Sequence, residues 1–466
     1  MNKPAEAVAT AVDGIQERLT SYACDLNFDD LGLQTIHAAK VRIIDTLGAL
    51  IAGFFSEPSR IARNLAVKTV SPQGATVLGT RTKTAPEMAA FANGTAARYW
   101  ELTDTYHYPG SFGGHPSDVV PALLAVAEYT QASGREFIAA VVLAYEIYLR
   151  INDIFDNMGF DHTNMCCLAT AVGAGKLLRL SSRQLAHCIS MAVVPNNALR
   201  LARMGHLSMW KATATGQAGK AGVFAAQLAD AGMEGPHLPF EGKSGWCDHV
   251  ALKRFSLDTM GGNDTSFKIL DTTFKLRPSV GWAISLILAT EKIPPINLRE
   301  IKEIVVELHK KAKAHIGTHA HHWSPDSKET ADHSAAYLVA AALMDGTITP
   351  RSYSDNRLWH PDIRALLPRI KVIENDEFTQ AYGRIPAEHH ARLTVVTNSG
   401  KRLVGESGHG KDELHAPKSD AQIAAKFRGL TEDYLGARRV NAILERLWHL
   451  EDLENTTEIP PDFVIG

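Results

Sequence analysis

The sequence predicts a mainly α-helical protein in which both chain ends build one helical domain around a smaller α+β domain. Helical patterns run from about Phe28 to Asp230, alternating β-branched runs follow between Gly261 and Pro417, and a helical pattern returns at Glu432–Leu450. A length of 466 residues also exceeds the size at which a single hydrophobic core usually stops growing. We therefore expect two domains.

Six segments of the first part are rich in Ala, Leu and Val and contain few helix-breaking residues. Several of them are apolar on nearly every side, and such a helix has to be surrounded by other helices. A bundle with buried central members is the consequence. The six segments are Leu31–Gly53, Glu87–Leu102, Val119–Ala132, Gly134–Asn152, Asn164–Leu180 and Ser182–Ala192.

The middle part predicts strands and one Ala-rich helix at Thr330–Asp345. The expected strands are Ile301–His309, Ile370–Ile373, Leu393–Thr397 and Arg402–Val404, the last two joined as a hairpin by Asn398-Ser399-Gly400. After Pro417, Ser419 begins a capped helix that is expected to return to the bundle. The predicted division is 1–262 and 416–466 for the helical domain and 263–415 for the α+β domain.

Composition argues against several classes of function. Lys and Arg total 48 against 51 Asp and Glu, a net charge of −3, which does not favour nucleic-acid or membrane-surface binding. The N-terminus lacks the apolar stretch of a signal peptide, and no run approaches the roughly 20 apolar residues of a membrane span. Five cysteines form no CxxC pair, so a reducing compartment, the cytoplasm, is expected.

The segment from Trp100 to Asp118 gathers polar side chains at a helix end and in the following loop. Glu101, Asp104, Thr105 and His115 belong to it, and such a place allows side chains to converge on a cavity. Capping and loop solvation are the alternative roles.

Four further residues could serve a reaction on an anionic substrate. His162 precedes a long apolar helix, where it is either a helix cap or a group that moves protons near neutral pH. Lys220 lies among small residues, and a lysine that extends along the helix surface to solvent is the alternative. Lys275 and Arg277 stand at the predicted domain junction, where they could bind an anion or form interdomain salt bridges.

Asp332, His333 and Tyr337 lie within two turns at the start of the Ala-rich helix, and the last two share a face. A structural role for Tyr337 is the alternative to a functional one. His315, His319, His321 and His322 crowd together, but no Cys or paired carboxylate completes a metal-ligand spacing, so no metal is expected. Neither a P-loop nor a nucleophile elbow is present.

Taken in order, these segments resemble the MmgE/PrpD family, most strongly its 2-methylcitrate dehydratase branch, over about Ala38 to Leu450. The residues that carry the resemblance are Asn93-Gly94-Thr95-Ala96, Asp104-Thr105-Tyr106, Gly114-His115-Pro116-Ser117-Asp118, Asp161-His162, Leu207-Ser208-Met209-Trp210-Lys211, Pro239-Phe240-Glu241-Gly242 and Glu329-Thr330-Ala331-Asp332-His333-Ser334.

The resemblance implies a large helical domain with a smaller α+β lid, a homodimer, and a lyase that needs neither metal nor organic cofactor. The implied reaction is dehydration of a small hydroxy-polycarboxylate such as 2-methylcitrate or citrate. An epimerase or decarboxylase of a related acid, similar to iminodisuccinate or cis-aconitate, is the alternative, as is a non-catalytic polycarboxylate-binding dimer. The sequence does not identify the acid.

The resemblance places pocket residues at Glu101, Thr105, His115, His162, Lys220, Lys275 and Tyr337. Lys220, Lys275 and Arg277 are expected to hold substrate carboxylates, assisted by Asp104. His162 is favoured as the base, and His115 or Tyr337 as the acid. Two departures from the family matter, because Glu101 replaces the usual Asp and the chain has Trp282 but no His shortly after Lys275 and Pro278.

Overall fold

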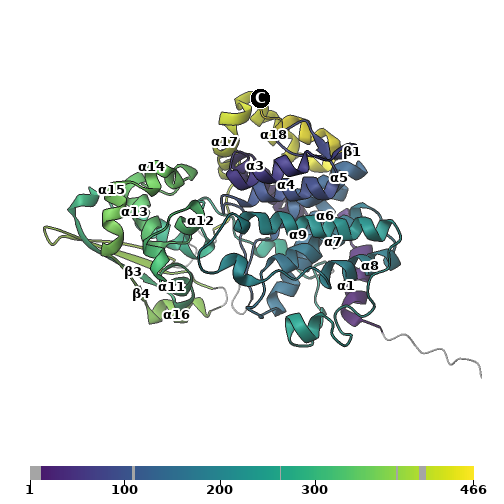
Figure 1. Cartoon of the computed structure of the whole chain (residues 1–466), viewed down its shortest axis with the longest axis horizontal. Helices are drawn as coiled ribbons and strands as arrows, with labels where there is room; N and C mark the ends of the chain where they lie inside the picture. Colours follow the sequence, from purple (N-terminus) through teal and green to yellow (C-terminus); the bar gives the residue numbers. More distant parts are fainter. Residues whose placement is uncertain (1–11, 108–110, 263, 385–386, 409–415) are drawn as a thin grey trace, which may run out of the picture.

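The computed structural model describes residues 12–107, 111–262, 264–384, 387–408 and 416–466. Two large hydrophobic cores organise these residues. The first core takes members from Ile15 to Phe274 and again from Ile423 to Phe463, while the second runs from Val280 to Val395. In Figure 1 the chain forms two lobes, with the C-terminal helices α17 (Asp420–Leu435) and α18 (Ala437–Trp448) on the larger one. The predicted mainly α fold is confirmed.

The larger lobe is a helical bundle whose central helices are buried on almost all sides. Most residues of α6 and nearly every residue of α7 are buried, as the scarcity of polar positions in these segments predicts. The elements before the lobe crossing are α1 (Gly14–Asp25), α2 (Leu33–Gly53), α3 (Glu57–Ala66), β1 (Val70–Thr76), β2 (Lys83–Thr84), α4 (Pro86–Arg98), α5 (Val120–Thr130), α6 (Gly134–Ile154), α7 (Thr163–Leu177), α8 (Ser182–Val193) and α9 (Trp210–Asp230). Of these, α1, α3 and the two short strands were not predicted.

Small residues let α9 approach its neighbours closely. A Cβ atom added at Gly222 would lie 2.6 Å from the carbonyl oxygen of Cys167 in α7, and one at Gly216 would lie 2.3 Å from the carbonyl oxygen of Phe91 in α4. Real Cβ contacts are never that short, so only glycine fits at both positions. The close packing fixes the start of α9, where Lys211 lies, against the end of α4.

The smaller lobe is built on a sheet with the strand order β4-β3-β5-β6. The strands are β3 (Ile301–Leu308), β4 (Ile370–Glu374), β5 (Ala391–Thr397) and β6 (Arg402–Ser407). β3 runs parallel to β4 and antiparallel to β5, and β5 pairs antiparallel with β6. All four predicted strands are present with shifted ends, and Gly400 at φ 86° makes the expected tight hairpin.

Short helices surround this sheet. They are α10 (Ile284–Glu291), α11 (Lys310–Ile316), α12 (Lys328–Ala331), α13 (Ala335–Asp345), α14 (Asp355–Leu358), α15 (Pro361–Leu366) and α16 (Asp376–Tyr382). Ile304, Val306 and Leu308 alternate along β3 as buried residues, as a half-buried strand requires. Among the helices that the structure describes in either lobe, none is long and apolar enough to cross a membrane.

The predicted helix Thr330–Asp345 is interrupted. α12 ends at Ala331, and α13 begins only after Ser334, whose side chain accepts a hydrogen bond from the Tyr337 backbone N–H. Serine favours such an N-cap because its hydroxyl competes with the helical backbone for hydrogen bonds. Asp332 lies in the break, fully buried, where it faces the helical lobe.

A second difference lies at the end of α4. The predicted helix reaches Leu102, whereas α4 ends at Arg98 and Glu101 takes a left-handed backbone conformation with φ 53°. This conformation costs a residue with a Cβ atom free energy, so tertiary contacts of the Glu101 side chain have to hold it. The predicted helix Glu432–Leu450 is likewise divided, because Gly436 at φ 78° separates α17 from α18.

Candidate active site

A cavity of about 370 Å³ lies where residues of both lobes meet. The larger lobe contributes the end of α4, the loop around His115, His162, and the 3₁₀ turn Arg200–Arg203, while the smaller lobe contributes residues 280–282, α11 and the histidine-rich turn after α11. Cations outnumber carboxylates in the described lining, with Arg98, Arg200, Arg203 and Lys311 against Glu101 and Asp161. The cavity therefore suits an anionic molecule.

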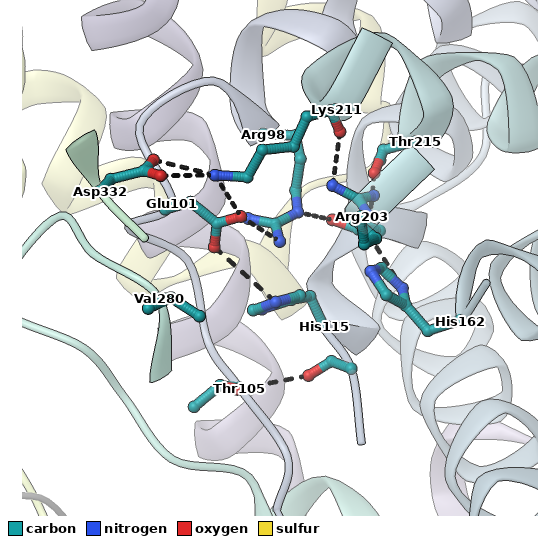
Figure 2. A network of polar contacts seen from close by, with 12 residues as sticks. Arg98, Glu101, Thr105, His115, His162, Arg203, Lys211, Thr215, Val280 and Asp332 are labelled. Carbon is teal, nitrogen blue, oxygen red and sulfur yellow. Dashed lines mark hydrogen bonds and ion pairs between the residues drawn. The ribbon is translucent and has the colours of Figure 1, made fainter. Parts of the chain in front are cut away.

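One wall of this cavity belongs to a buried ionic cluster, in which Arg98 and Glu101 line the cavity and Lys211, Lys275 and Asp332 lie behind them. Glu101 Oε1 lies 2.8 Å from an Arg98 nitrogen and 3.2 Å from Lys211 Nζ. Lys211 Nζ also lies 2.9 Å from Asp332 Oδ1, so that it links the two lobes. Figure 2 shows Asp332, Lys211, Glu101 and Arg98 joined in this way. Since each of these charges has an opposite charge beside it, the cluster can exist without water.

Glu101 is the centre of the cluster. Burial alone would raise the pKa of its carboxyl group, but Arg98 and Lys211 hold that pKa well below its ordinary range. The second oxygen, Oε2, lies 3.6 Å from Lys275 Nζ and 3.8 Å from His115 Nε2, and it has no hydrogen-bond partner within the described chain. A negative charge is therefore fixed beside His115.

His115 is held in a defined protonation state. Its Nδ1 lies 2.8 Å from the carbonyl oxygen of Asp104, and because a carbonyl only accepts, Nδ1 carries the hydrogen. Burial, with Arg98 nearby, lowers the pKa of His115 well below its ordinary value. The ring is consequently neutral, and the lone pair of Nε2 is available at the cavity.

His162 is the second imidazole, with its ring centre 5.3 Å from that of His115. The Tyr148 hydroxyl lies 3.0 Å from His162 Nδ1 and accepts a hydrogen bond from the His115 backbone N–H at 3.2 Å. Since the phenol proton then needs an acceptor, it is donated to Nδ1, which leaves the ring hydrogen of neutral His162 on Nε2. Burial lowers the pKa of His162 to about 3.

Two guanidinium groups on the cavity wall keep donor capacity that the described residues do not use. Arg98 Nη1 and Arg203 Nη2 are buried and have no hydrogen-bond partner within the described chain, whereas Arg98 Nε lies 3.5 Å from Asp118 Oδ1 in an ion pair. Arg203 is oriented by Asp161 at 3.1 Å and by the carbonyl oxygen of Lys211 at 2.6 Å. Buried donors without partners are costly, so these atoms are suited to ligand oxygens or water.

Comparison with known sequences assigns the family. The model of the MmgE/PrpD N-terminal domain matches residues 17–257, and that of the MmgE/PrpD C-terminal domain matches residues 279–450. The chain belongs to the MmgE/PrpD family.

Individual relatives of this MmgE/PrpD chain are distant but cover most of its length. A probable 2-methylcitrate dehydratase of Saccharomyces cerevisiae is 27% identical over 74% of this chain and 71% of its own. The 2-methylcitrate dehydratase of Escherichia coli K12 is 26% identical over 77% of each chain. The cis-aconitate decarboxylase of Homo sapiens is 25% identical over 97% of this chain and 92% of its own.

Several residues predicted from the sequence do come together in this family member. Glu101, His115 and His162 line the cavity, and Lys275 lies behind it, fully buried, with Nζ 2.5 Å from the carbonyl oxygen of Glu101. Burial lowers the pKa of Lys275 to about 7. Lys275 thus supports the loop of Glu101.

Asp104 and Thr105 lie beneath the His115 loop, where they bond to protein groups. Asp104 Oδ1 accepts from the Ser117 backbone N–H at 3.1 Å, and Oδ2 accepts from the Tyr145 hydroxyl at 3.0 Å. Thr105 Oγ1 lies 3.0 Å from His107 Nε2. Both residues therefore position the loop.

Three predicted site residues lie away from the described lining of this cavity. The Tyr337 hydroxyl donates to the carbonyl oxygen of Ser352 within the core of the smaller lobe, at 2.5 Å. Arg277 is paired with Glu291, also at 2.5 Å, which is the salt-bridge alternative. Lys220 Nζ lies 6.0 Å from the centre of the Phe91 ring. Protein groups thus contact all three side chains outside the described lining, and their contact with substrate stays a prediction.

Arg98, Arg203, Lys211 and Asp332 are parts of the site that the residue-by-residue prediction missed. Lys211 and Asp332 both stand inside segments that carry the family resemblance. On that ground, Lys211 could have been preferred to Lys220 as a site residue. Arg98 could have been found from its i, i+3 spacing to Glu101. Nothing in the local sequence singles out Arg203.

Four clustered histidines, in α11 and in the turn after it, form part of the cavity wall. His315, His319, His321 and His322 all belong to the lining. Within the described ranges, no group of three or more His, Cys, Asp or Glu side chains is arranged to hold a metal ion.

Proposed function

We propose that this protein is a lyase that dehydrates a small hydroxy-polycarboxylate such as 2-methylcitrate or citrate, with protein groups alone as acid and base. The observation that carries the proposal is the pair of neutral imidazoles, His115 and His162, with ring centres 5.3 Å apart in a cavity lined by unsatisfied guanidinium donors. Relatives named 2-methylcitrate dehydratase support the same reaction class.

Arg98 and Arg203 bind the carboxylate next to the reacting carbon in this proposal. Hydrogen bonds from buried guanidinium groups to a carboxylate are charge-assisted and frequently bidentate. When the adjacent C–H loses its proton, negative charge spreads onto that carboxylate. Donors that already point at it stabilise this charge without reorganising.

His115 is the general base. Its Nε2 lone pair removes the proton from the carbon next to the carboxylate, the C–H electron pair becomes the C=C bond, and the C–O bond to the hydroxyl breaks. His162 donates its Nε2 proton to the departing oxygen, which leaves as water. Before the next turnover, His115 has to lose a proton and His162 has to regain one. This assignment exchanges the roles expected from the sequence, because Tyr148 occupies His162 Nδ1.

Depressed pKa values do not conflict with these roles. A neutral imidazole with a low pKa is a weak base in the empty cavity, but two or three substrate carboxylates add negative charge a few ångströms away. Such charge favours the protonated imidazole and raises the pKa of both rings. The base therefore gains strength when the correct substrate is bound.

The first experiment incubates the chelator-treated protein with 2-methylcitrate, citrate, cis-aconitate and iminodisuccinate in D₂O and follows the products by NMR. Formation of an alkene and water from a hydroxy acid supports the dehydratase. Deuterium exchange or inversion without elimination would replace it with an epimerase, and loss of CO₂ with a decarboxylase. Binding with no turnover of any acid would leave a non-catalytic polycarboxylate-binding protein.

A decarboxylase is the second candidate because the human cis-aconitate decarboxylase aligns with 97% of this chain. Decarboxylation also creates charge on a carbon flanked by carboxylate, and one imidazole could protonate that carbon. The same cavity would serve, with His162 as the proton donor.

We also propose that the protein is a cytoplasmic homodimer. Support comes from a groove of about 790 Å³ on the larger lobe, around which Leu199, Leu201, Met204 and Trp210 are exposed. Clustered apolar residues of this kind are typical of interaction surfaces. Light scattering of the purified protein would test the dimer.

A further inference from the structure

Two cations at the cavity are distinct from the buried ionic cluster because neither forms an ion pair with a carboxylate of the described chain. Arg200 and Lys311 both line the cavity, and within the described chain neither forms an ion pair with Asp or Glu. The carboxylates of the lining are otherwise engaged, since Glu101 pairs with Arg98 and Asp161 with Arg203.

Neutral groups hold these two cations in place. The Arg200 guanidinium lies 5.2 Å from the centre of the Phe112 ring and donates to His315 Nε2 at 3.3 Å. His315 Nδ1 donates to the carbonyl oxygen of Lys311 at 2.8 Å, so the ring is neutral when it accepts from Arg200. Lys311 Nζ lies 5.6 Å from the centre of the Tyr382 ring. These contacts orient both charges and cancel neither.

The two cations come from different lobes. Arg200 begins the 3₁₀ turn Arg200–Arg203 of the larger lobe, whereas Lys311 lies in the first turn of α11 in the smaller lobe. Burial lowers the pKa of each, although the negative charge of Asp161 partly offsets this for Arg200. The positive charge of Arg200 lowers the pKa of Lys311 further. Two like charges brought together without a counter-ion repel, and an anion between them removes the repulsion.

We propose that Arg200 and Lys311 together form an outer subsite that binds a further carboxylate of the substrate, beyond the one that Arg98 and Arg203 hold. The subsite makes the protein selective for tricarboxylates over dicarboxylates, and the bound carboxylate ties the smaller lobe to the larger one. This inference rests on the proposed function for the inner carboxylate, but it concerns binding, so it can be tested without turnover.

Trp282 contributes to the subsite through His315. The indole stacks on the His315 ring with centres 5.5 Å apart and planes at 30°, and it also packs 4.4 Å from the His107 ring. This chain lacks the histidine that the family resemblance leads one to expect shortly after Pro278, and its Trp282 instead supports the imidazole that orients Arg200.

The test is calorimetric binding of tricarballylate, which has three carboxylates and no hydroxyl to lose, and of glutarate, which has two. Arg200→Gln and Lys311→Gln are each expected to weaken tricarballylate binding about tenfold, the effect of losing one charge-assisted contact, and to change glutarate binding less than about twofold. Lys310→Gln is the matched control, because Lys310 precedes Lys311 on α11, is exposed and does not belong to the described lining.

Equal weakening of both acids, or none in either variant, would overturn the subsite. Thermal unfolding of each variant checks that the fold is retained, and the Lys310→Gln result separates a local contact from a general loss of positive charge. If wild type binds tricarballylate selectively but turns over no acid, the subsite stands and the lyase proposal fails. If wild type turns over a tricarboxylate selectively but both variants bind tricarballylate as tightly as wild type, the lyase proposal stands and the subsite fails.

Discussion

The buried ionic cluster and the outer subsite use positive charge in different ways. In the buried ionic cluster, Arg98, Lys211 and Lys275 share the carboxylates of Glu101 and Asp332, so their charges hold the two lobes and the catalytic loop in position. At the outer subsite, Arg200 and Lys311 are held only by rings and neutral imidazole. A cation kept without a carboxylate partner in a cavity is available to a ligand, whereas Lys211 and Lys275, whose partners are carboxylates inside the protein, maintain structure. Arg98 and Arg203 do both, since each pairs with a carboxylate and still keeps an N–H group without a partner in the described chain.

The largest effect on activity is expected at His115 and His162, the two imidazoles of the cavity. His115→Ala should lower kcat by a factor of about 10² to 10⁴, the usual contribution of a general base, while the protein stays folded. His162→Ala should lower it by a comparable factor. Steady-state rates on the acid that the wild type converts provide the measurement, and His237→Ala, at an exposed position far from the described lining, is the control. A His115→Ala enzyme of near wild-type rate would remove the assigned base.

Removing one charge from the buried ionic cluster should lower the free energy of unfolding. Glu101→Gln leaves Arg98, Lys211 and Lys275 with too little negative charge in a buried place, and the loss of one partner from such a cluster costs about 3–5 kcal/mol. The free energy of unfolding from urea denaturation measures this change. Glu57→Gln, which removes an exposed i, i+3 pair with Arg60, should leave unfolding unchanged. Equal stability of the two variants would mean that the cluster does not hold the site together.

The stability of the site should also depend on pH through His162. Its folded pKa of about 3 lies below the ordinary 6.5, so between these values the unfolded chain binds more protons and stability falls as pH falls. From pH 7 to pH 5 this amounts to about 2 kcal/mol. Asp118 opposes it below pH 6, because burial raises the pKa of that carboxyl group to about 6.

Comparison of wild type with His162→Asn isolates this contribution, since Asp118 is present in both proteins. Unfolding free energies at pH 7 and pH 5 should converge between the two as the pH falls, with the variant showing the flatter dependence. Parallel curves would show that His162 is not buried in its neutral form.

The smallest effect is expected at Trp282, which acts on the outer subsite only through His315. Trp282→Leu removes the ring that stacks on His315 and should raise KM for a tricarboxylate about threefold with little change in kcat, less than the change at Arg200 itself. The paired measurement on a dicarboxylate should show no change. A fall in kcat alone would place Trp282 nearer to the reacting carbon than this account does.

Much of the fold could be predicted from the pattern of apolar and polar residues, because helices without a polar face and alternating strands are local properties of the sequence. The two lobes, the four strands of the larger sheet and the central helices were predictable in this way. The breaks at Asp332 and after Arg98 were not, since they depend on Lys211 and on the cluster around Glu101, which are contacts between distant segments.

The candidate site could be predicted only in part for the same reason, because contacts between distant segments are not visible in the local sequence. His115, His162 and Glu101 were found because each stands in a segment of unusual composition, and the structure places all three at one cavity. Tyr337 and Arg277 carry suitable chemistry, but their partners, Ser352 and Glu291, lie elsewhere in the chain and could not be foreseen. A binding role for Arg200 could not be predicted either, because it depends on Lys311, which only the folded chain brings to the same cavity.

A crystal structure of the His115→Ala variant with 2-methylcitrate or citrate bound would show how the cavity holds its substrate. We expect one carboxylate on Arg98 and Arg203, another between Arg200 and Lys311, and the reacting carbon within reach of the emptied His115 position and of His162 Nε2. An acid bound with its carboxylates on Lys220 or Arg277, or outside the cavity, would contradict this placement of the substrate.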